Sequence, residues 1–194
     1  MPTRRSILQS AAVLSATSVA PKVVFADDIA QSGHIGVIYD SRHLESRTFG
    51  GRASRLGFLT HAIEGDITDF WQTELRSLWK RGPVTIAGLT ERPALFLLEQ
   101  LGWDYGLRVV YQAEHETGEP GSAEHRIVRS ANPGLKRQLE AAGALWPSAL
   151  AEQILTAPRD LAATDYTPSG SAMTAYLGEP TKLYSWIIAP RPAA

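Results

Sequence analysis

Six polar residues between positions 40 and 115 have side chains that could carry out a reaction or bind a ligand. Each stands at, or just after, the expected carboxyl end of a strand: Asp40, His43, Asp66, Thr90, Glu114 and His115. Carboxylates together with a histidine can act as general acid and base, or can bind a divalent ion through oxygen and imidazole ligands. We expect Asp40, Asp66, Glu114 and His115 to be catalytic, and His43 and Thr90 to contact the ligand.

The same residues have an alternative, structural interpretation. Asp66 and Thr90 stand where helices are expected to begin, a position at which Asp and Thr often cap the first turn. Asp40 and Ser41 together suit a turn. The candidate ligands are dispersed along the chain and show no close His-x-x-x-His spacing, so we expect no metal site.

A common site requires that the strands before these residues run in the same direction in one sheet. Short apolar runs predict strands at 35–39, 58–63 and 84–88, and a fourth strand that starts with 107–111 and ends near Glu114 and His115. Helical patterns lie between them at 44–56, 67–81 and 91–101. In an open parallel sheet, ligands bind in the crevice beyond the carboxyl ends of the strands. This alternation therefore predicts that the six polar residues lie along one rim of the sheet.

The second half of the chain predicts a change of strand direction. After a polar loop at 116–122, alternating residues at 125–129 predict a hairpin that returns antiparallel to the strand at 107–111. Helices are expected at 132–139 and 147–156, a long loop at 158–180 and a last strand at 183–188. We therefore expect a three-layer α/β domain with a mostly parallel sheet, an antiparallel edge strand and helices on both faces.

The composition limits the function further. The chain of 194 residues is 44% hydrophobic and 20% charged, which fits a single globular domain. It contains no cysteine, which excludes disulfides, thiolate metal sites and cysteine nucleophiles. The net charge is −1, and −4 without the three basic residues of the first 26 positions, which argues against a nucleic-acid partner. No apolar run reaches the roughly 18 residues of a spanning helix, so we expect no stable membrane span in the mature form.

The first 26 residues have the features of an export signal. Basic residues precede a moderately apolar stretch at 11–20, and small residues end at Ala26, as is typical of a segment removed after export. The run Thr3-Arg4-Arg5-Ser6-Ile7-Leu8-Gln9 resembles the twin-arginine translocation motif, with Ile7 in place of the usual Phe and Gln9 in place of the usual Lys. A general secretory signal or a chance pair of arginines is the alternative.

The resemblance implies a bacterial protein that folds in the cytoplasm and is exported intact by the twin-arginine machinery, to become periplasmic or secreted. It implies a signal peptide at 1–26, and we expect a linker at 27–33, one α/β domain at 34–190 and a tail at 191–194. Proteins that use this route typically carry a cofactor, or travel with a partner that carries one.

Two functions fit these observations. The chain has no Gly-x-Gly-x-x-Gly at a strand–helix turn, no Walker motif and no Gly-x-Ser-x-Gly elbow, so the sequence names no cofactor. The first hypothesis is a periplasmic accessory or ligand-binding protein, one form of which is a cofactor-free subunit of a periplasmic redox enzyme. The alternative is a small periplasmic hydrolase or lyase whose Asp, Glu and His side chains at the strand ends supply acid–base catalysis.

Overall fold

The computed structural model of the chain describes residues 35–118, 122–161 and 182–190. Several predictions fall on other residues: the signal peptide at 1–26, the linker at 27–33, most of the long loop at 158–180, and the tail at 191–194. These segments lie outside the described residues.

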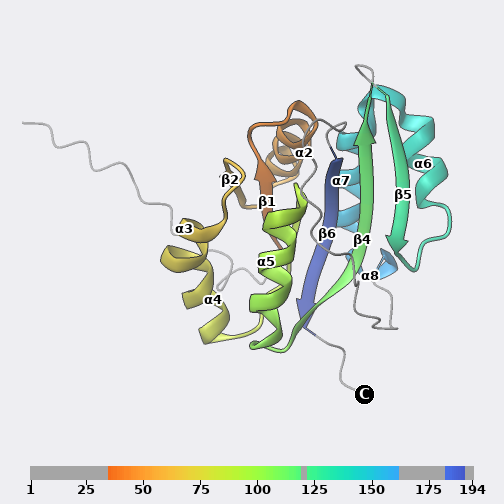
Figure 1. Ribbon diagram of the computed structural model, residues 1–194. Helices are drawn as coiled ribbons and strands as arrows, with labels where there is room; N and C mark the ends of the chain where they lie inside the picture. Colours follow the sequence, from red (N-terminus) through yellow and green to blue (C-terminus); the bar gives the residue numbers. More distant parts are fainter. Residues whose placement is uncertain (1–34, 119–121, 162–181, 191–194) are drawn as a thin grey trace, which may run out of the picture.

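Within the described residues, six strands form one sheet in the order β2-β1-β3-β6-β4-β5 (Figure 1). The strands are β1 (Gly36–Asp40), β2 (Thr60–Ile63), β3 (Ile86–Thr90), β4 (Leu107–Thr117), β5 (Ala123–Arg129) and β6 (Lys182–Pro190). β2 and β3 pair parallel with β1, whereas β6 pairs antiparallel with both β3 and β4, and β5 pairs antiparallel with β4. β1 to β4 therefore run in one direction, and β5 and β6 in the other. The predicted α/β fold, with a mostly parallel sheet and an antiparallel edge strand, is confirmed.

The position of β6 in the sheet is not part of the prediction from the sequence. The sequence predicts the strands now called β3 and β4 as successive members of the parallel set, but β6 lies between them and pairs with both. Its composition explains this position, because Leu183, Trp186, Ile187 and Ile188 are all buried and leave no polar face for solvent. A strand that is apolar on both faces belongs in the interior of a sheet.

The helices lie on both faces of the sheet. Their bounds are α2 (Leu44–Arg55), α3 (Thr68–Phe70), α4 (Arg76–Arg81), α5 (Arg92–Trp103), α6 (Leu135–Ala142), α7 (Trp146–Thr156) and α8 (Pro158–Leu161). A π-helical turn at Trp71–Leu75 joins α3 to α4, so the helix predicted at 67–81 is present with one wide turn. None of the helices in the described part of the chain combines the length and apolar character needed to cross a bilayer.

Two hydrophobic clusters fill the spaces between helices and sheet. Ile38 and Trp186 belong to a cluster with residues of α3, α4 and α5, whereas the neighbouring residues Val37 and Ile187 belong to a cluster with residues of α2, α6 and α7. Successive side chains of a strand point to opposite faces, so the two clusters lie on opposite sides of the sheet. In Figure 1, α5 lies in front of the sheet and α7 behind it. The chain therefore leaves β1 toward one face, into α2, and leaves β3 toward the other, into α5.

Close packing between β3 and β6 fixes the end of β3. The indole of Trp186 lies against Gly88, and a Cβ at this glycine would also come within 2.7 Å of the carbonyl oxygen of Ile38. Only glycine fits here without moving the backbone of β1. The indole Nε1 of Trp186 then donates a hydrogen bond of 3.1 Å to Oγ1 of Thr90, the last residue of β3.

Candidate functional site

The strand register shows which of the residues predicted to line one rim of the sheet lie in the same row. Tyr39 of β1 pairs with Leu89 of β3, so the next residues, Asp40 and Thr90, lie side by side at the carboxyl ends of their strands. Thr90 pairs with Tyr184 of β6, which in turn pairs with Glu114 of β4. Glu114 is therefore in the same row, but two strand spacings from Thr90, or roughly 10 Å.

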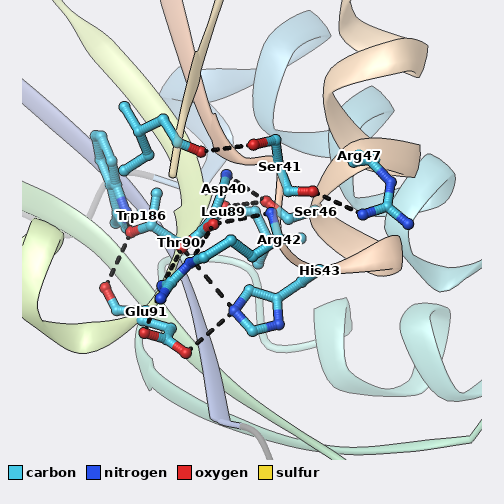
Figure 2. A network of polar contacts seen from close by, with 11 residues as sticks. Asp40, Ser41, Arg42, His43, Ser46, Arg47, Leu89, Thr90, Glu91 and Trp186 are labelled. Atoms are coloured by element: carbon cyan, nitrogen blue, oxygen red, sulfur yellow. Dashed lines mark hydrogen bonds and ion pairs between the residues drawn. The ribbon is translucent and has the colours of Figure 1, made fainter. Parts of the chain in front are cut away.

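Four charged or titratable side chains meet at the ends of β1 and β3, and we call Asp40, Arg42, His43 and Glu91 the rim cluster (Figure 2). Arg42 donates from Nε to Oδ1 of Asp40 at 3.0 Å, and from Nη2 to Oδ2 at 2.7 Å. Nη2 also donates to Oε2 of Glu91 at 2.6 Å. Nε2 of His43 lies 3.1 Å from Oε1 of Glu91 and 3.9 Å from Oδ2 of Asp40. Arg42 thus joins the carboxylates that follow two neighbouring strands.

The backbone around the rim cluster is fixed by a buried serine. Oγ of Ser46, in the first turns of α2, accepts a hydrogen bond of 2.7 Å from the backbone N–H of Asp40 and donates to the carbonyl oxygen of Leu89. Ser46 therefore ties the end of β1 to the end of β3. The backbone N–H of Arg42 donates to Oδ1 of Asp40 at 3.1 Å, which closes the turn that leads into α2.

The electrostatics of the rim cluster favour ionised groups. Burial alone would raise the pKa of Asp40, but hydrogen bonds from Arg42 and the charges of Arg42 and His43 outweigh it and hold the pKa below its ordinary value. Hydrogen bonds to Asp40 raise the pKa of Arg42, despite partial burial, and Glu91 adds to this effect. The side chain of Asp40 is fully buried, whereas those of Arg42, Glu91 and His43 are 43%, 34% and 17% exposed. A ligand can therefore reach the last three but not Asp40.

The rim cluster also contains the donor atoms of a metal site. Ligand atoms of Asp40, His43 and Glu91 lie within 4.8 Å of one another, and two carboxylates with an imidazole suit divalent transition metals. However, the guanidinium of Arg42 already bonds to both carboxylates, at 2.7 and 2.6 Å. A divalent ion would have to displace this fixed positive charge, so the arrangement does not favour a metal.

The structure does not bring Asp66 into the rim cluster. Asp66 is exposed, and its Oδ1 accepts a hydrogen bond of 2.8 Å from the backbone N–H of Thr68 at the start of α3. Hydrogen bonds from Thr68, first from its side chain and then from its backbone N–H, lower the pKa of Asp66. The preceding residue, Gly65, packs against the guanidinium of Arg42. The loop after β2 thus contacts Arg42 through the backbone of Gly65, while the Asp66 side chain stabilises the helix start.

Thr90 lies beside the rim cluster, but with its side chain in the interior. The sequence predicts Thr90 as a helix cap, whereas β3 continues through this residue and Glu91 takes the position before α5. Thr90 is fully buried, and its hydroxyl donates to the carbonyl oxygen of Glu91 at 3.1 Å while accepting from Trp186. Its hydroxyl therefore positions Glu91 and has no access to a ligand.

Glu114 and His115 do not join the rim cluster, because β6 lies between β3 and β4. β4 continues to Thr117, so both residues lie inside it and point to opposite faces. Glu114 pairs with Arg126 of β5, at 3.0 Å to Nε and 2.5 Å to Nη2. The expected common site of Asp40, Asp66, Glu114 and His115 is therefore corrected: of these four, only Asp40 belongs to the rim cluster.

His115 instead belongs to a buried line of hydrogen bonds, which we call the histidine chain: Tyr111, Ser185, His115 and His125. The hydroxyl of Tyr111 lies 2.9 Å from Oγ of Ser185, which lies 2.7 Å from Nε2 of His115. Nδ1 of His115 lies 2.8 Å from Nδ1 of His125, its partner in the predicted hairpin. Burial, with a smaller effect of His125, lowers the pKa of His115 well below its ordinary value. The histidine chain is therefore made of neutral groups.

Sequence reasoning missed Arg42 and Glu91 as members of a site. Arg42 belongs to a group of basic residues that the sequence favours as a solvated face, and Glu91 suits the positive end of a helix. The available signal was their position, since each follows a predicted strand end by three residues. Their contact joins residues 49 positions apart in the chain, which no local pattern reveals.

Comparisons with protein-family models, with curated proteins and with solved structures found no match to this chain. The function is therefore argued from the geometry of the rim cluster and the histidine chain.

Proposed function

We propose that the protein is an exported ligand-binding protein that takes a small polar molecule at the rim cluster. One observation carries the proposal: Arg42, His43 and Glu91 converge where β1 and β3 lead to helices on opposite faces of the sheet. At such a switch point the two loops diverge, and open α/β sheets bind their ligands there.

The chemistry of the rim cluster suggests the type of ligand. With His43 neutral, the two carboxylates and the guanidinium of Arg42 give the rim cluster a net charge of −1. With His43 protonated, the net charge is zero. Arg42 offers N–H donors and Glu91 offers carboxylate acceptors on the exposed side. A molecule with both donors and acceptors fits better than a strongly charged anion. Asp40 is a positioning residue, which acts on the ligand through Arg42.

Export and a redox partner are part of the proposal on different grounds. They rest on the amino-terminal residues that resemble a twin-arginine signal and on the absence of cysteine from the sequence. The proposed role is a periplasmic accessory protein, and one form of it is a cofactor-free subunit of an oxidoreductase. Co-purification from a periplasmic extract tests this role; a protein recovered as a monomer without any partner contradicts it.

Native mass spectrometry of the full chain, purified from periplasm, tests ligand binding directly. We expect the wild-type protein to retain a small molecule, and the variants Glu91→Gln and His43→Gln to lose it. Both substitutions leave the Asp40–Arg42 pair in place, so the fold should be kept. Glu45→Gln, on the first turn of α2, is the matched control and should retain the molecule. A wild-type protein without any bound molecule, or a molecule that both variants retain, would contradict the proposal.

A second candidate function, a small hydrolase or lyase, is favoured by the contact between His43 and Glu91. With the Nε2 proton directed at Glu91, 3.1 Å away, Nδ1 of His43 carries a free lone pair, and it has no hydrogen-bond partner among the described residues. An imidazole oriented by a carboxylate is a common general base, and Arg42 would stabilise developing negative charge.

Hydrolysis of p-nitrophenyl esters and phosphates provides a test of the second function. We expect His43→Gln to reduce the rate by about 10²-fold or more, since general-base catalysis contributes that much. Glu45→Gln is again the control. Turnover that is unaffected by His43→Gln, or no turnover with any ester or phosphate, would leave ligand binding as the function of the rim cluster.

A further inference from the structure

A cleft separate from the rim cluster lies between edge strand β5 and the start of α6. Its volume is about 480 Å³, and its lining includes His125, Ile127, Ser130, Asn132, Pro133 and Lys136. β5 is three strands from β3 in the sheet, so this cleft and the rim cluster are distinct places. The proposed function uses none of these residues.

His125 connects the cleft to the histidine chain. Its side chain is almost fully buried, with 2% of the residue exposed, yet it lines the cleft. Nδ1 of His125 forms a hydrogen bond with Nδ1 of His115, whereas Nε2 of His125 has no hydrogen-bond partner among the described residues. This ring nitrogen of a nearly buried imidazole is therefore available to a molecule that enters the cleft.

The direction of the hydrogen bonds determines what His125 offers to the cleft. Tyr111 and Ser185 bond only within the histidine chain among the described residues, so the buried O–H of Tyr111 must donate to Oγ of Ser185. The hydroxyl of Ser185 then donates to Nε2 of His115, and Nδ1–H of His115 donates to Nδ1 of His125. His125 therefore carries its proton on Nε2. The opposite direction would leave the O–H of Tyr111 buried without an acceptor, which costs about 1–3 kcal/mol.

Other lining groups also present donors, because local bonds use their acceptors. Oγ of Ser130 accepts from the backbone N–H of Asn132 at 3.0 Å, which leaves the hydroxyl proton free. Oδ1 of Asn132 accepts from the backbone N–H of Gly134 at 2.8 Å, which leaves the amide NH₂ free. Lys136 adds an ammonium group.

Two acidic residues near the cleft limit this positive character only in part. Glu140 pairs with Lys136 at 3.6 Å, but both side chains are 50% exposed and Glu140 is not among the lining residues. Glu124 lines the cleft, but it is the neighbour of His125 in β5, so its side chain points to the opposite face. Arg126 also lines the cleft, but its guanidinium is bonded to Glu114.

We propose that this cleft binds a compact oxyanionic group, a carboxylate or a phosphate, through Nε2–H of His125, the hydroxyl of Ser130 and the ammonium of Lys136. Burial lowers the pKa of His125, with Glu140 raising it and Lys136 lowering it, so the imidazole binds as a neutral donor. The anion site extends beyond the ligand site proposed at the rim cluster and does not depend on it.

Nuclear magnetic resonance of the ¹⁵N-labelled full chain at pH 7 tests the site, since long-range ¹H–¹⁵N spectra identify the protonated ring nitrogen. The probes are sodium phosphate and sodium acetate, each compared with sodium chloride at equal ionic strength. The indole of Trp146 stacks on His115 at 4.6 Å between ring centroids and lies 5.1 Å from His125, so it is a second reporter. We expect a proton on Nε2 of His125. We also expect saturable chemical-shift changes of the His125 imidazole and the Trp146 indole with phosphate or acetate, but not with chloride.

Variants separate a built site from general charge attraction. Lys136→Gln and Ser130→Ala should each weaken binding, Lys136→Gln by about tenfold or more, as expected for a lost charge-assisted hydrogen bond. Lys80→Gln, at an exposed lysine of α4, should leave binding unchanged. The proposal is overturned by a proton on Nδ1 of His125, by shifts that do not saturate or that chloride reproduces, or by binding insensitive to both variants. Glu91→Gln should not affect this titration, which separates failure of this site from failure of the rim cluster.

Discussion

The rim cluster and the histidine chain belong to one sheet but accommodate polar side chains in different ways. The rim cluster contains full charges in direct contact, and solvent reaches part of it. The histidine chain is buried, and its members are joined by single directional hydrogen bonds. The difference teaches that the partner decides the chemistry: the buried Asp40 stays charged because the guanidinium of Arg42 lies against it, whereas His115 has only neutral partners and stays neutral.

The pKa values of the two regions express the same contrast. The pKa of Asp40 and the pKa of His115 are both lowered, but with opposite consequences. A lowered pKa keeps an aspartate ionised, whereas it keeps a histidine neutral. At the rim, burial would raise the pKa of Asp40, but the hydrogen bonds and charge of Arg42 outweigh it and lower this pKa. In the histidine chain, burial itself lowers the pKa of His115.

The largest effect is expected when the rim cluster loses its cation. Arg42→Ala should lower the free energy of unfolding by about 3 kcal/mol or more, because Asp40 is fully buried and would be left without its partner. Urea denaturation measures this change. Adding Asp40→Asn to Arg42→Ala should recover part of the loss, since no unpaired charge then remains.

The matched control for Arg42 is Arg76→Ala, at an exposed arginine of α4, which should change stability by less than about 0.5 kcal/mol. If Arg42→Ala behaves like Arg76→Ala, the charges of the rim cluster are not coupled as described.

The next largest effect concerns the middle of the histidine chain. Ser185→Ala should destabilise the protein by about 2 kcal/mol, because it leaves both the hydroxyl of Tyr111 and Nε2 of His115 buried without a partner. Tyr111→Phe removes only the hydroxyl at the end of the histidine chain and should lower the free energy of unfolding by about 1 kcal/mol. Urea denaturation of both variants, with the exposed Ser77→Ala as control, checks the order. Equal costs for the two would contradict the assigned bond directions.

The two regions should also lose stability in different pH ranges. A histidine with a lowered pKa in the folded state takes up fewer protons than in the unfolded chain, so its stabilisation is complete above pH 6.5 and is lost as the pH falls toward the folded value. This applies to His115 and His125, and to His61, whose pKa burial lowers to about 4. The contribution of Asp40 is lost only when the pH falls below its ordinary pKa of 3.8.

We therefore expect the free energy of unfolding to decrease between pH 7 and pH 5, by up to about 1.4 kcal/mol per pH unit for each histidine. Urea denaturation at several pH values measures how the free energy of unfolding changes with pH. His61→Gln should reduce this slope by the contribution of one histidine. A free energy that is constant from pH 7 to pH 5 would show that these imidazoles are not shielded from protonation.

The smallest effect is expected on the exposed side of the rim cluster. Glu91→Gln should change the free energy of unfolding by less than about 1 kcal/mol, because its pair with Arg42 is partly solvated and Asp40 still holds the guanidinium. Thermal denaturation beside Glu45→Gln checks this. A loss comparable to that of Arg42→Ala would mean that Glu91, rather than Asp40, anchors the cluster.

Local patterns predicted most elements but not how they associate. The helix predicted at 44–56 spans Leu44–Arg55, and the predicted hairpin does place His125 opposite His115, because only five residues separate the two strands and limit their register. The insertion of β6 was not predictable, since the alternation of a strand says nothing about its neighbours. The contact between His43 and Glu91 escaped for the same reason, because it depends on how β1 and β3 pair.

The late position of β6 in the chain has a consequence for biogenesis. Until residues 182–190 have left the ribosome, β2-β1-β3 and β4-β5 are two half sheets that share no backbone ladder. A prematurely terminated product would expose the apolar flanks of both halves to chaperones and proteases. Under the proposed export of a folded protein, β6 would have to be in place before the molecule is translocated.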